Sequence, residues 1–215
     1  MLGVPSTKSN LVLGVDEAGR GPLAGPVSVG VVAVSEGFDV LKEFPGVRDS
    51  KKLSEKRREK IFQMLEARAK TGDIKYNVEL ESAEVIDEEG ITVAVRRALW
   101  RGVNVLVDKY RSLTSVKLGK SDFHILLDDA LKAPPEYSQE TIINGDELVP
   151  IISLASIVAK VTRDRLMVEL AKKYPLYGFE KHKGYGTVVH YEMLKKHGLC
   201  VIHRHSFIHL DFKPK

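Results

Sequence analysis

Acidic residues stand beside apolar segments at three points along this 215-residue chain. Asp16 and Glu17 directly follow one apolar run, and Asp128 directly follows another. Asp146 comes shortly before a long segment rich in small residues. Acidic residues at strand ends are usually solvated loop residues, so each position alone has an ordinary explanation. Together they indicate a second possibility, a cluster of carboxylates at one edge of a sheet.

Such a carboxylate cluster predicts metal-dependent chemistry. Negative charges gathered in one place repel one another, and the simplest stabilising partners are divalent cations. Ligand sets made only of oxygen favour Mg²⁺ or Mn²⁺. Two such ions about 4 Å apart can activate a water and stabilise the leaving oxygen of a phosphodiester. Our hypothesis is therefore a two-metal site, provided that these carboxylates meet in space.

A glycine-rich loop, Gly19-Arg20-Gly21, follows the first two acids. The simplest interpretation is a tight turn that needs positive φ. The alternative is that the glycines let backbone groups approach a ligand such as the 2′-hydroxyl of RNA, which donates and accepts hydrogen bonds. A dinucleotide-binding loop is a poor match, because the glycine spacing differs, Pro22 interrupts the turn and the loop leads into a strand.

Tyr185 lies between two glycines in a basic loop that contains Lys181, His182 and Lys183. A tyrosine is more often an ordinary core or surface residue. The flanking glycines favour exposure here, and an exposed ring can stack on a sugar or a base.

Basic residues also gather around residues 51–58. Ser50 and Lys51 are candidate phosphate contacts. The basic residues that follow, Lys52, Lys56, Arg57 and Arg58, could extend a phosphate-facing strip, although a solvated helix face is the usual explanation for most of them. Arg163 and Asp164 fit a structural role and a role in supporting the site equally well.

The histidines near the C-terminus resemble a metal cluster only superficially. His203, His205 and His209 have no cysteine or acidic partner at zinc spacing, so we expect no zinc site. The single cysteine, Cys200, excludes an intramolecular disulfide and favours a reducing, cytoplasmic setting. We expect it to be a buried or partly buried residue and not a nucleophile.

The elements that must position these residues follow from the apolar pattern. Apolar runs predict strands over 11–15, 27–34 and 123–127, with a short strand over 140–143. Capping residues and periodicity predict helices over 54–69, from 82 or 83 past Trp100, over 150–174 and over 187–197. Small residues in the first half of the 150–174 helix indicate close packing against a sheet. The order predicts an α/β fold, a mixed sheet flanked by helices.

Composition is that of an ordinary globular protein, with 43% hydrophobic and 29% charged residues. The formal net charge of +4 permits a nucleic-acid partner without requiring one. No apolar run approaches the roughly 20 residues needed to span a bilayer, and residues 1–10 lack the apolar core of a secretory signal. We expect one domain and no membrane partner.

Five motifs in order resemble those of the ribonuclease HII family. They are Gly14–Pro26, Asp49–Leu53 with Arg57 and Arg58 after it, Ala155–Asp164, His182–Thr187 and His203–Phe207. The resemblance spans almost the whole chain and implies a ribonuclease H-like fold. It implies one catalytic domain over 1–215, with 175–215 as a helical C-terminal substrate-binding extension. The extra N-terminal domain of the sister family, ribonuclease HIII, has no room here.

The resemblance also implies residue roles and an activity. Asp16, Glu17, Asp128 and Asp146 match the catalytic, metal-binding carboxylates. Gly19, Arg20 and Gly21 match the residues that read the 2′-hydroxyl, and Tyr185 matches the residue that packs at the RNA–DNA junction. The implied enzyme uses Mg²⁺ or Mn²⁺ to cut the RNA strand of RNA–DNA hybrids and to incise 5′ to ribonucleotides embedded in duplex DNA. The products carry 3′-hydroxyl and 5′-phosphate ends, and we expect a cytoplasmic monomer.

The chain departs from the family pattern at three places. Asp129 stands where the family usually has glycine, which leaves open whether Asp128 or Asp129 is the ligand; we favour Asp128, since it directly follows the apolar run. Asn144 stands where a lysine is common. Residues 111–120 are expected to form an added loop, for which we have no functional interpretation.

Two other functions remain possible. A non-catalytic hybrid-binding protein on the same fold would need a missing carboxylate, and none is missing. Another metal-dependent nuclease, such as a junction resolvase, would keep the acids but would not need Gly19-Arg20-Gly21 or Tyr185.

Overall fold

The computed structural model describes residues 11–48, 52–113, 115 and 117–208. Within these residues the chain forms a mixed sheet in the order β3-β2-β1-β4-β5. The strands are β1 (Leu11–Ala18), β2 (Val27–Ser35), β3 (Ile74–Glu81), β4 (Phe123–Asp128) and β5 (Ser138–Ile142). β1 pairs antiparallel with β2 and parallel with β4, so the carboxyl ends of β1 and β4 lie at the same edge.

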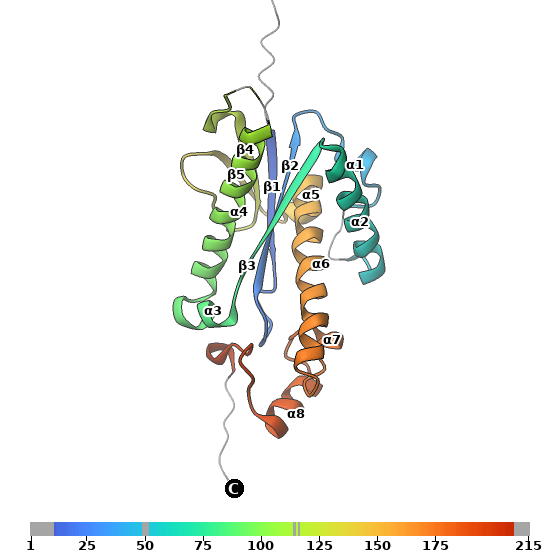
Figure 1. The fold of residues 1–215 in the computed structure, drawn as a ribbon, viewed down its shortest axis with the longest axis vertical. Helices are drawn as coiled ribbons and strands as arrows, with labels where there is room; N and C mark the ends of the chain where they lie inside the picture. Colours follow the sequence, from blue (N-terminus) through green and yellow to red (C-terminus); the bar gives the residue numbers. More distant parts are fainter. Residues whose placement is uncertain (1–10, 49–51, 114, 116, 209–215) are drawn as a thin grey trace, which may run out of the picture.

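Helices cover both faces of this sheet (Figure 1). The helices are α1 (Val40–Glu43), α2 (Glu55–Thr71), α3 (Ala83–Glu89), α4 (Ile91–Leu113), α5 (Gly145–Leu148), α6 (Pro150–Lys173), α7 (Phe179–His182) and α8 (Val188–His197), with 3-10 turns at Lys120–Asp122 and His205–Phe207. α4 packs on one face, and α2 and α6 pack on the other. α7 and α8 lie beyond the far end of α6, where they form a third apolar cluster with Leu23 and Met167.

The long helix α6 lies unusually close to the sheet, because two strand positions have no side chain. A Cβ added at Gly14 would lie 2.5 Å from the carbonyl oxygen of Ile151, and one at Gly30 would lie 2.4 Å from that of Ala155. On the helix side, Ser153, Ala155 and Ala159 are buried and small. The close packing predicted from the small residues of this segment is confirmed.

The predicted α/β architecture is confirmed, and three details differ. The helix expected from 82 or 83 past Trp100 is two helices, because Gly90 takes φ 84° and ψ 153° and ends α3. β3 was not predicted. Residues 111–113, expected in an added loop, are the last residues of α4. No helix among the residues described is long and apolar enough to cross a membrane.

Candidate active site

Asp16 and Asp128 lie side by side at the carboxyl ends of two parallel strands. Val15 of β1 pairs with Leu127 of β4, so the next residue of each strand is an aspartate in neighbouring register. Both aspartates and Glu17 line a cavity of about 460 Å³ at this edge of the sheet. The structure thus brings together three of the four carboxylates that were predicted to meet.

Burial and mutual repulsion make this cluster electrostatically unfavourable without a cation. The pKa of Asp16 is raised well above its usual value, first by burial and then by the charges of Glu17 and Asp128. Hydrogen bonds from the Ser156 hydroxyl and from the Glu17 N–H, the latter 2.7 Å long, oppose that shift. Burial also raises the pKa of Glu17, although its ion pair with Arg20 at 2.7 Å acts in the opposite direction.

Asp146 lies behind Asp128 and does not line the cavity. The Asp146 backbone N–H donates to Asp128 Oδ1 at 3.1 Å, and Asp146 is fully buried. It occupies the first turn of α5, directly after Asn144, whose φ is 53°. The fourth predicted carboxylate is therefore a neighbour of the cluster, held by a hydrogen bond to one of its members.

The structure distinguishes the two adjacent aspartates at the end of β4. Asp128 is 6% exposed, whereas Asp129 is exposed and accepts a hydrogen bond from the Asn144 N–H at 3.1 Å. Asp129 has φ 43°, in the left-handed region that glycine and, less readily, aspartate adopt. A backbone requirement thus accounts for the glycine that is usual at this position.

The donor set suits a hard divalent cation. All the acidic side chains in the cavity offer oxygen only, and the raised pKa values show that charge of the opposite sign would stabilise them. Within the residues described, no three acidic, histidine or cysteine side chains already stand at ligand distance from one point. A bound ion would therefore have to draw these carboxylates together.

Two buried arginines hold the glycine-rich loop and the segment that follows it in place. The guanidinium of Arg204 donates to the carbonyl oxygens of Gly19, Arg20 and Gly25 at 2.7–2.9 Å. Burial, and then the charge of Arg163, lower the pKa of Arg204 to about 9. Gly19 has φ 91°, so the tight-turn interpretation of this glycine is confirmed. The loop lines the same cavity as the carboxylates.

Arg163 is the second of these arginines and has a structural role. Its guanidinium donates to the carbonyl oxygens of Ala24, Pro26 and Lys183 at 2.8–3.0 Å. It thereby joins the segment after the glycine-rich loop to the segment before Tyr185. Its neighbour Asp164 forms an ion pair with Lys160 at 2.7 Å.

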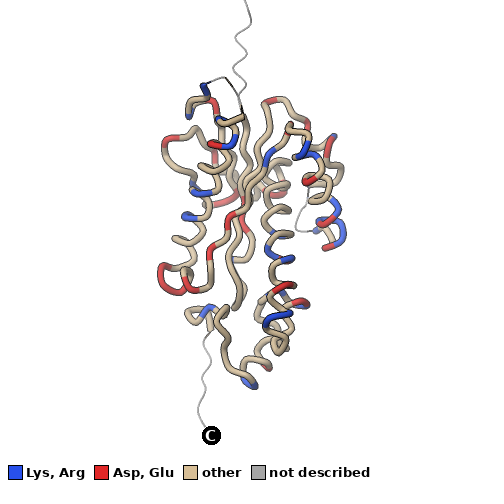
Figure 2. The backbone as a smooth tube through the Cα atoms, viewed as in Figure 1, with Lys and Arg blue, Asp and Glu red and all other residues tan. Residues whose placement is uncertain are grey.

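Tyr185 lies at the cavity wall with 41% of its surface exposed. The Lys160 ammonium is 5.5 Å from the ring centroid and the Arg163 guanidinium 5.9 Å. Such cation–π contacts stabilise the ring, and the exposed part of the residue remains accessible from the cavity. Basic residues lie along the second half of α6, which leads towards this loop (Figure 2).

Some residues named from the sequence fall outside the described part of the chain, and some residues of the site were not predicted. Ser50, Lys51 and His209 lie outside the described residues. Arg58, from the basic stretch after Lys51, lines the cavity. Ser156 lines it too, although no sequence pattern indicates a chemical role for it. Arg204 falls within a family-like motif, but no sequence pattern indicates that it anchors a loop nearly 185 positions earlier.

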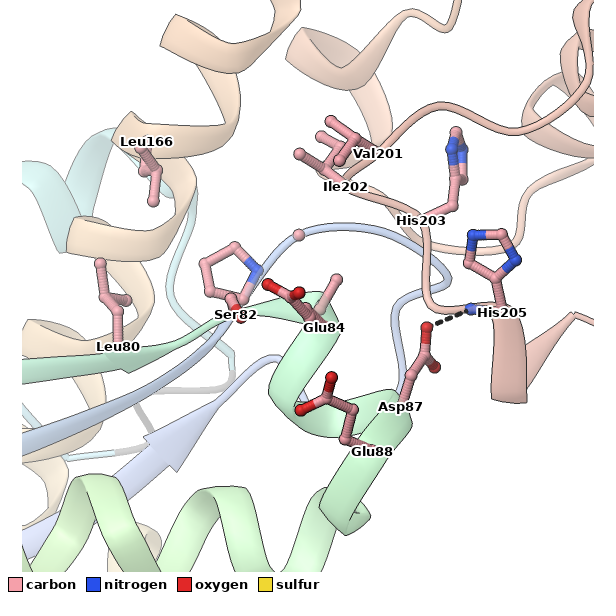
Figure 3. Close-up of a pocket in the computed structure, with 13 residues that line it drawn as sticks. Leu80, Ser82, Glu84, Asp87, Glu88, Leu166, Val201, Ile202, His203 and His205 are labelled. Carbon is pink, nitrogen blue, oxygen red and sulfur yellow. Dashed lines mark hydrogen bonds between the residues drawn. The ribbon is translucent and has the colours of Figure 1, made fainter.

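A larger cavity of about 790 Å³ lies between α3 and the segment around His203 (Figure 3). Its side chains are mostly apolar, with Glu84, Asp87 and Glu88 at one side. Lysine and arginine do not occur among its lining residues, and the acidic side would repel phosphates. The smaller, charged cavity at the strand ends is therefore the candidate active site.

Comparisons with known proteins agree on one family. The family model described as Ribonuclease HII matches residues 13–210. A ribonuclease HII from Endomicrobium trichonymphae is 45% identical over 197 residues, which make up 91% of this chain and 84% of that protein.

Solved structures with the same fold include two ribonucleases H. The ribonuclease H2 from Pyrococcus horikoshii OT3 is 31% identical, with a TM-score of 0.60, over 91% of this chain and 93% of that one. The Bst-RNase HIII in complex with Mn²⁺ is 18% identical, with a TM-score of 0.66, over 88% of this chain and 63% of that one. The second similarity concerns the fold alone.

Proposed function

This chain belongs to the ribonuclease HII family and is a ribonuclease H, and from that premise we propose that it incises duplex DNA 5′ to embedded ribonucleotides. It also cuts the RNA strand of RNA–DNA hybrids and leaves 3′-hydroxyl and 5′-phosphate ends. The observation that supports this most directly is the single cavity shared by Asp16, Glu17, Asp128, the glycine-rich loop and Tyr185. The carboxylates proposed for catalysis and the residues proposed for substrate recognition thus line the same cavity.

We assign the carboxylates to metal binding and catalysis. Asp16, Glu17, Asp128 and Asp146 would hold the divalent ions, with Asp146 reaching the site from behind Asp128. When bound, two such ions activate the attacking water and stabilise the leaving 3′ oxygen. Divalent dependence agrees with the family, and the Mn²⁺ complex of a protein with the same fold supports Mn²⁺ as one usable ion. Ser156, through its hydrogen bond to Asp16, would orient that carboxylate.

We assign recognition to the two loops joined by the buried arginines. The carbonyls of Gly19 and Arg20 already accept hydrogen bonds from Arg204, which holds the loop rigid against the cavity. Backbone groups of Gly19, Arg20 and Gly21 would contact the 2′-hydroxyl, because a glycine-rich backbone can approach a sugar closely. Tyr185 would stack at the junction between a ribonucleotide and the following deoxyribonucleotide. Ser50 and Lys51 would contact phosphate.

The proposed activity is tested with a DNA duplex that contains one ribonucleotide. Wild type and Asp16→Asn are compared in Mg²⁺ and in Mn²⁺, with an all-DNA duplex as the control substrate. We expect incision 5′ to the ribonucleotide by the wild type and a loss of at least about 10³-fold in Asp16→Asn. Folded wild-type protein that leaves the ribonucleotide duplex intact with both ions would contradict the proposal.

A general metal-dependent nuclease is distinguished by Tyr185. Replacing Tyr185 with Ala should lower cleavage at a single-ribonucleotide junction by about 5- to 100-fold, because the stacking contact is lost. Tyr185→Phe keeps the ring and should stay within about threefold of wild type. Equal cleavage by all three proteins would favour a nuclease that does not read the junction.

The organisation of the chain is also a proposal. We infer one catalytic domain over 1–215, with 175–215 as the substrate-binding extension, acting as a cytoplasmic monomer. The bonds from Arg163 and Arg204 across this boundary support one unit over two independent ones.

A further inference from the structure

Three histidines pack directly behind the Tyr185 loop, and the proposed chemistry uses none of them. His182 at the end of α7 stacks on His190 of α8, with ring centroids 4.5 Å apart. His190 Nε2 lies 3.1 Å from Nε2 of His203. His190 and His203 are almost completely buried. Buried imidazoles in direct contact must have defined protonation states.

The hydrogen bonds determine those protonation states. His190 Nδ1 lies 3.0 Å from the carbonyl oxygen of Tyr185. A carbonyl oxygen can only accept, so Nδ1 of His190 has the proton, and in the neutral ring Nε2 must accept. His203 must then donate from Nε2, which leaves its Nδ1 to accept from the Cys200 N–H at 2.8 Å. The Cys200 carbonyl oxygen also lies 3.1 Å from this Nδ1, but it already accepts from the His203 backbone N–H at 2.9 Å. The bonds therefore run in one direction, from the Cys200 N–H through both rings to the Tyr185 carbonyl.

The surroundings keep both rings neutral. Burial lowers the pKa of His190 and lowers the pKa of His203 to about 4. The titratable groups that face the pair are His182, His205, Tyr177, Cys200 and Tyr185. This set contains no carboxylate to stabilise an imidazolium. Both nitrogens of His190 are used in hydrogen bonds, and the described residues contain no metal-binding group of histidines.

The Tyr185 loop needs such an anchor. Gly184, at φ 86°, and Gly186 flank the tyrosine and leave its backbone few intrinsic restraints. The Tyr185 N–H donates to the His182 carbonyl at 2.9 Å, and its carbonyl accepts from the Thr187 N–H at 2.8 Å. The bond from His190 is the contact that connects this loop to a buried side chain on α8.

We propose that His190 and His203 are positioning residues: the oriented pair fixes the Tyr185 carbonyl and so directs the tyrosine ring into the cavity. The inference rests on the role proposed for Tyr185 in binding the ribonucleotide junction. Its effect is on substrate binding, and the carboxylates that perform the chemistry are untouched.

Two substitutions of His190 separate this role from simple space filling. The amide nitrogen of asparagine takes the place of Nδ1, so His190→Asn can still donate to the Tyr185 carbonyl. The side-chain amide of glutamine reaches the place of Nε2, where its oxygen can accept from His203, so His190→Gln loses the bond to Tyr185 and keeps the side facing His203. We expect His190→Gln to raise KM for the single-ribonucleotide duplex about 3- to 10-fold with little change in kcat. His190→Asn should stay within about twofold of wild type, as should Glu192→Gln on the exposed side of α8.

If His190 served packing alone, its variants would change stability and the two would have the same KM. That result would overturn the inference without affecting the activity proposed for the wild type. A wild type that does not cut the substrate would refute the proposed function and the positioning role with it. If His190→Gln does not fold, ¹⁵N NMR of histidine-labelled wild type gives the answer near pH 7. Nδ1–H on His190 and Nε2–H on His203 are expected; the opposite tautomer on His190 would overturn the proposal.

Discussion

Asp16 shows how a residue can serve catalysis at the expense of stability. Its carboxylate is buried beside two other acidic side chains, and its pKa is raised by that burial and by their charges. An ionised Asp16 therefore penalises the folded state at neutral pH, and the penalty shrinks as the pH falls below the raised pKa and is gone below the ordinary pKa of 3.8. A bound cation would reverse the sign of this interaction.

We therefore expect Asp16→Asn to stabilise the metal-free protein by about 1 kcal/mol while abolishing cleavage. Thermal unfolding in EDTA and in excess Mn²⁺ measures the stability of each protein without and with the ion, and the duplex assay measures cleavage. The wild type should gain stability with Mn²⁺, and the variant should gain much less. The exposed Asp108→Asn on α4 is the control and should change stability by less than about 0.5 kcal/mol. A variant that is less stable in EDTA and responds fully to Mn²⁺ would contradict this account.

Asp129 is the residue where backbone conformation and chemistry can be separated. Its φ of 43° suits glycine, and its carboxylate caps the Asn144 N–H. We expect Asp129→Gly to retain cleavage within about threefold, because the conformation is kept and only an exposed hydrogen bond is lost. Asp128→Asn should lose at least about 10²-fold. Steady-state cleavage of the same duplex by both variants decides between the two aspartates, and the reverse order of effects would make Asp129 the ligand.

At the scale of elements, α6 must approach β1 and β2 closely, because it brings Ser156 and Lys160 to the cavity edge. A Cβ at Gly30 would lie 2.4 Å from the Ala155 carbonyl oxygen and 3.0 Å from the Ala159 nitrogen. Both are backbone atoms, so the helix itself would have to move. The distance between helix and sheet is thus set by a residue without a side chain.

Gly30→Ala is expected to destabilise the protein by about 2–3 kcal/mol and to lower activity as well, since α6 is displaced. Gly119→Ala is the matched control, because the nearest atom to its added Cβ would be a side-chain oxygen at 3.6 Å. We expect the control to lie within about 1 kcal/mol of wild type. Urea unfolding measures both, and equal stability of the two variants would show that the sheet and helix can separate without cost.

The elements that the sequence predicts well are helices that begin at a capping residue or at a proline. Ser54 caps α2, Pro150 begins α6 and Thr187 caps α8, and each helix begins where its cap predicts. β3 was missed although Ile74, Tyr76, Val78 and Leu80 alternate with polar residues, the pattern of a strand with one buried face. The break at Gly90 was missed because the apolar pattern continues across it.

The residues of the site also fall into those that the sequence can identify and those that it cannot. Asp16, Glu17 and the adjacent glycines are local in sequence and could be proposed from it. The partners that hold them could not, since Arg204 contacts Gly19 and Arg163 contacts Ala24 across most of the chain length. Sequence gives a buried arginine no distinguishing mark, because its burial depends on the carbonyl oxygens that tertiary structure brings to it.

On the scale of the whole molecule, buried polar groups link the C-terminal helices to the sheet. Arg163 and Arg204 each donate to three carbonyl oxygens, and the buried His190 and His203 bond to each other. These groups offset their desolvation only when every bond is made. The C-terminal helices should therefore unfold together with the sheet.

The burial of His203 predicts a specific loss of stability in acid. Burial lowers the pKa of His203 from 6.5 to about 4. Below about pH 6.5 the unfolded chain takes up a proton that the folded chain binds only near pH 4, so the stability contributed by neutral His203 is complete above about pH 6.5 and falls as the pH drops towards 4. The raised pKa values of Asp16 and Glu17 act in the opposite sense.

His203→Gln isolates the histidine contribution, because glutamine can donate towards His190 and has no proton to take up in the unfolded state. Between about pH 7 and pH 5 the wild type should lose roughly 2 kcal/mol more than the variant, while the other titrating groups act equally in both. Urea unfolding at the two pH values, followed by far-UV circular dichroism, gives the four free energies of unfolding. Parallel changes in the two proteins would mean that His203 takes up its proton in the folded state as readily as in the unfolded one, which would contradict the lowered pKa.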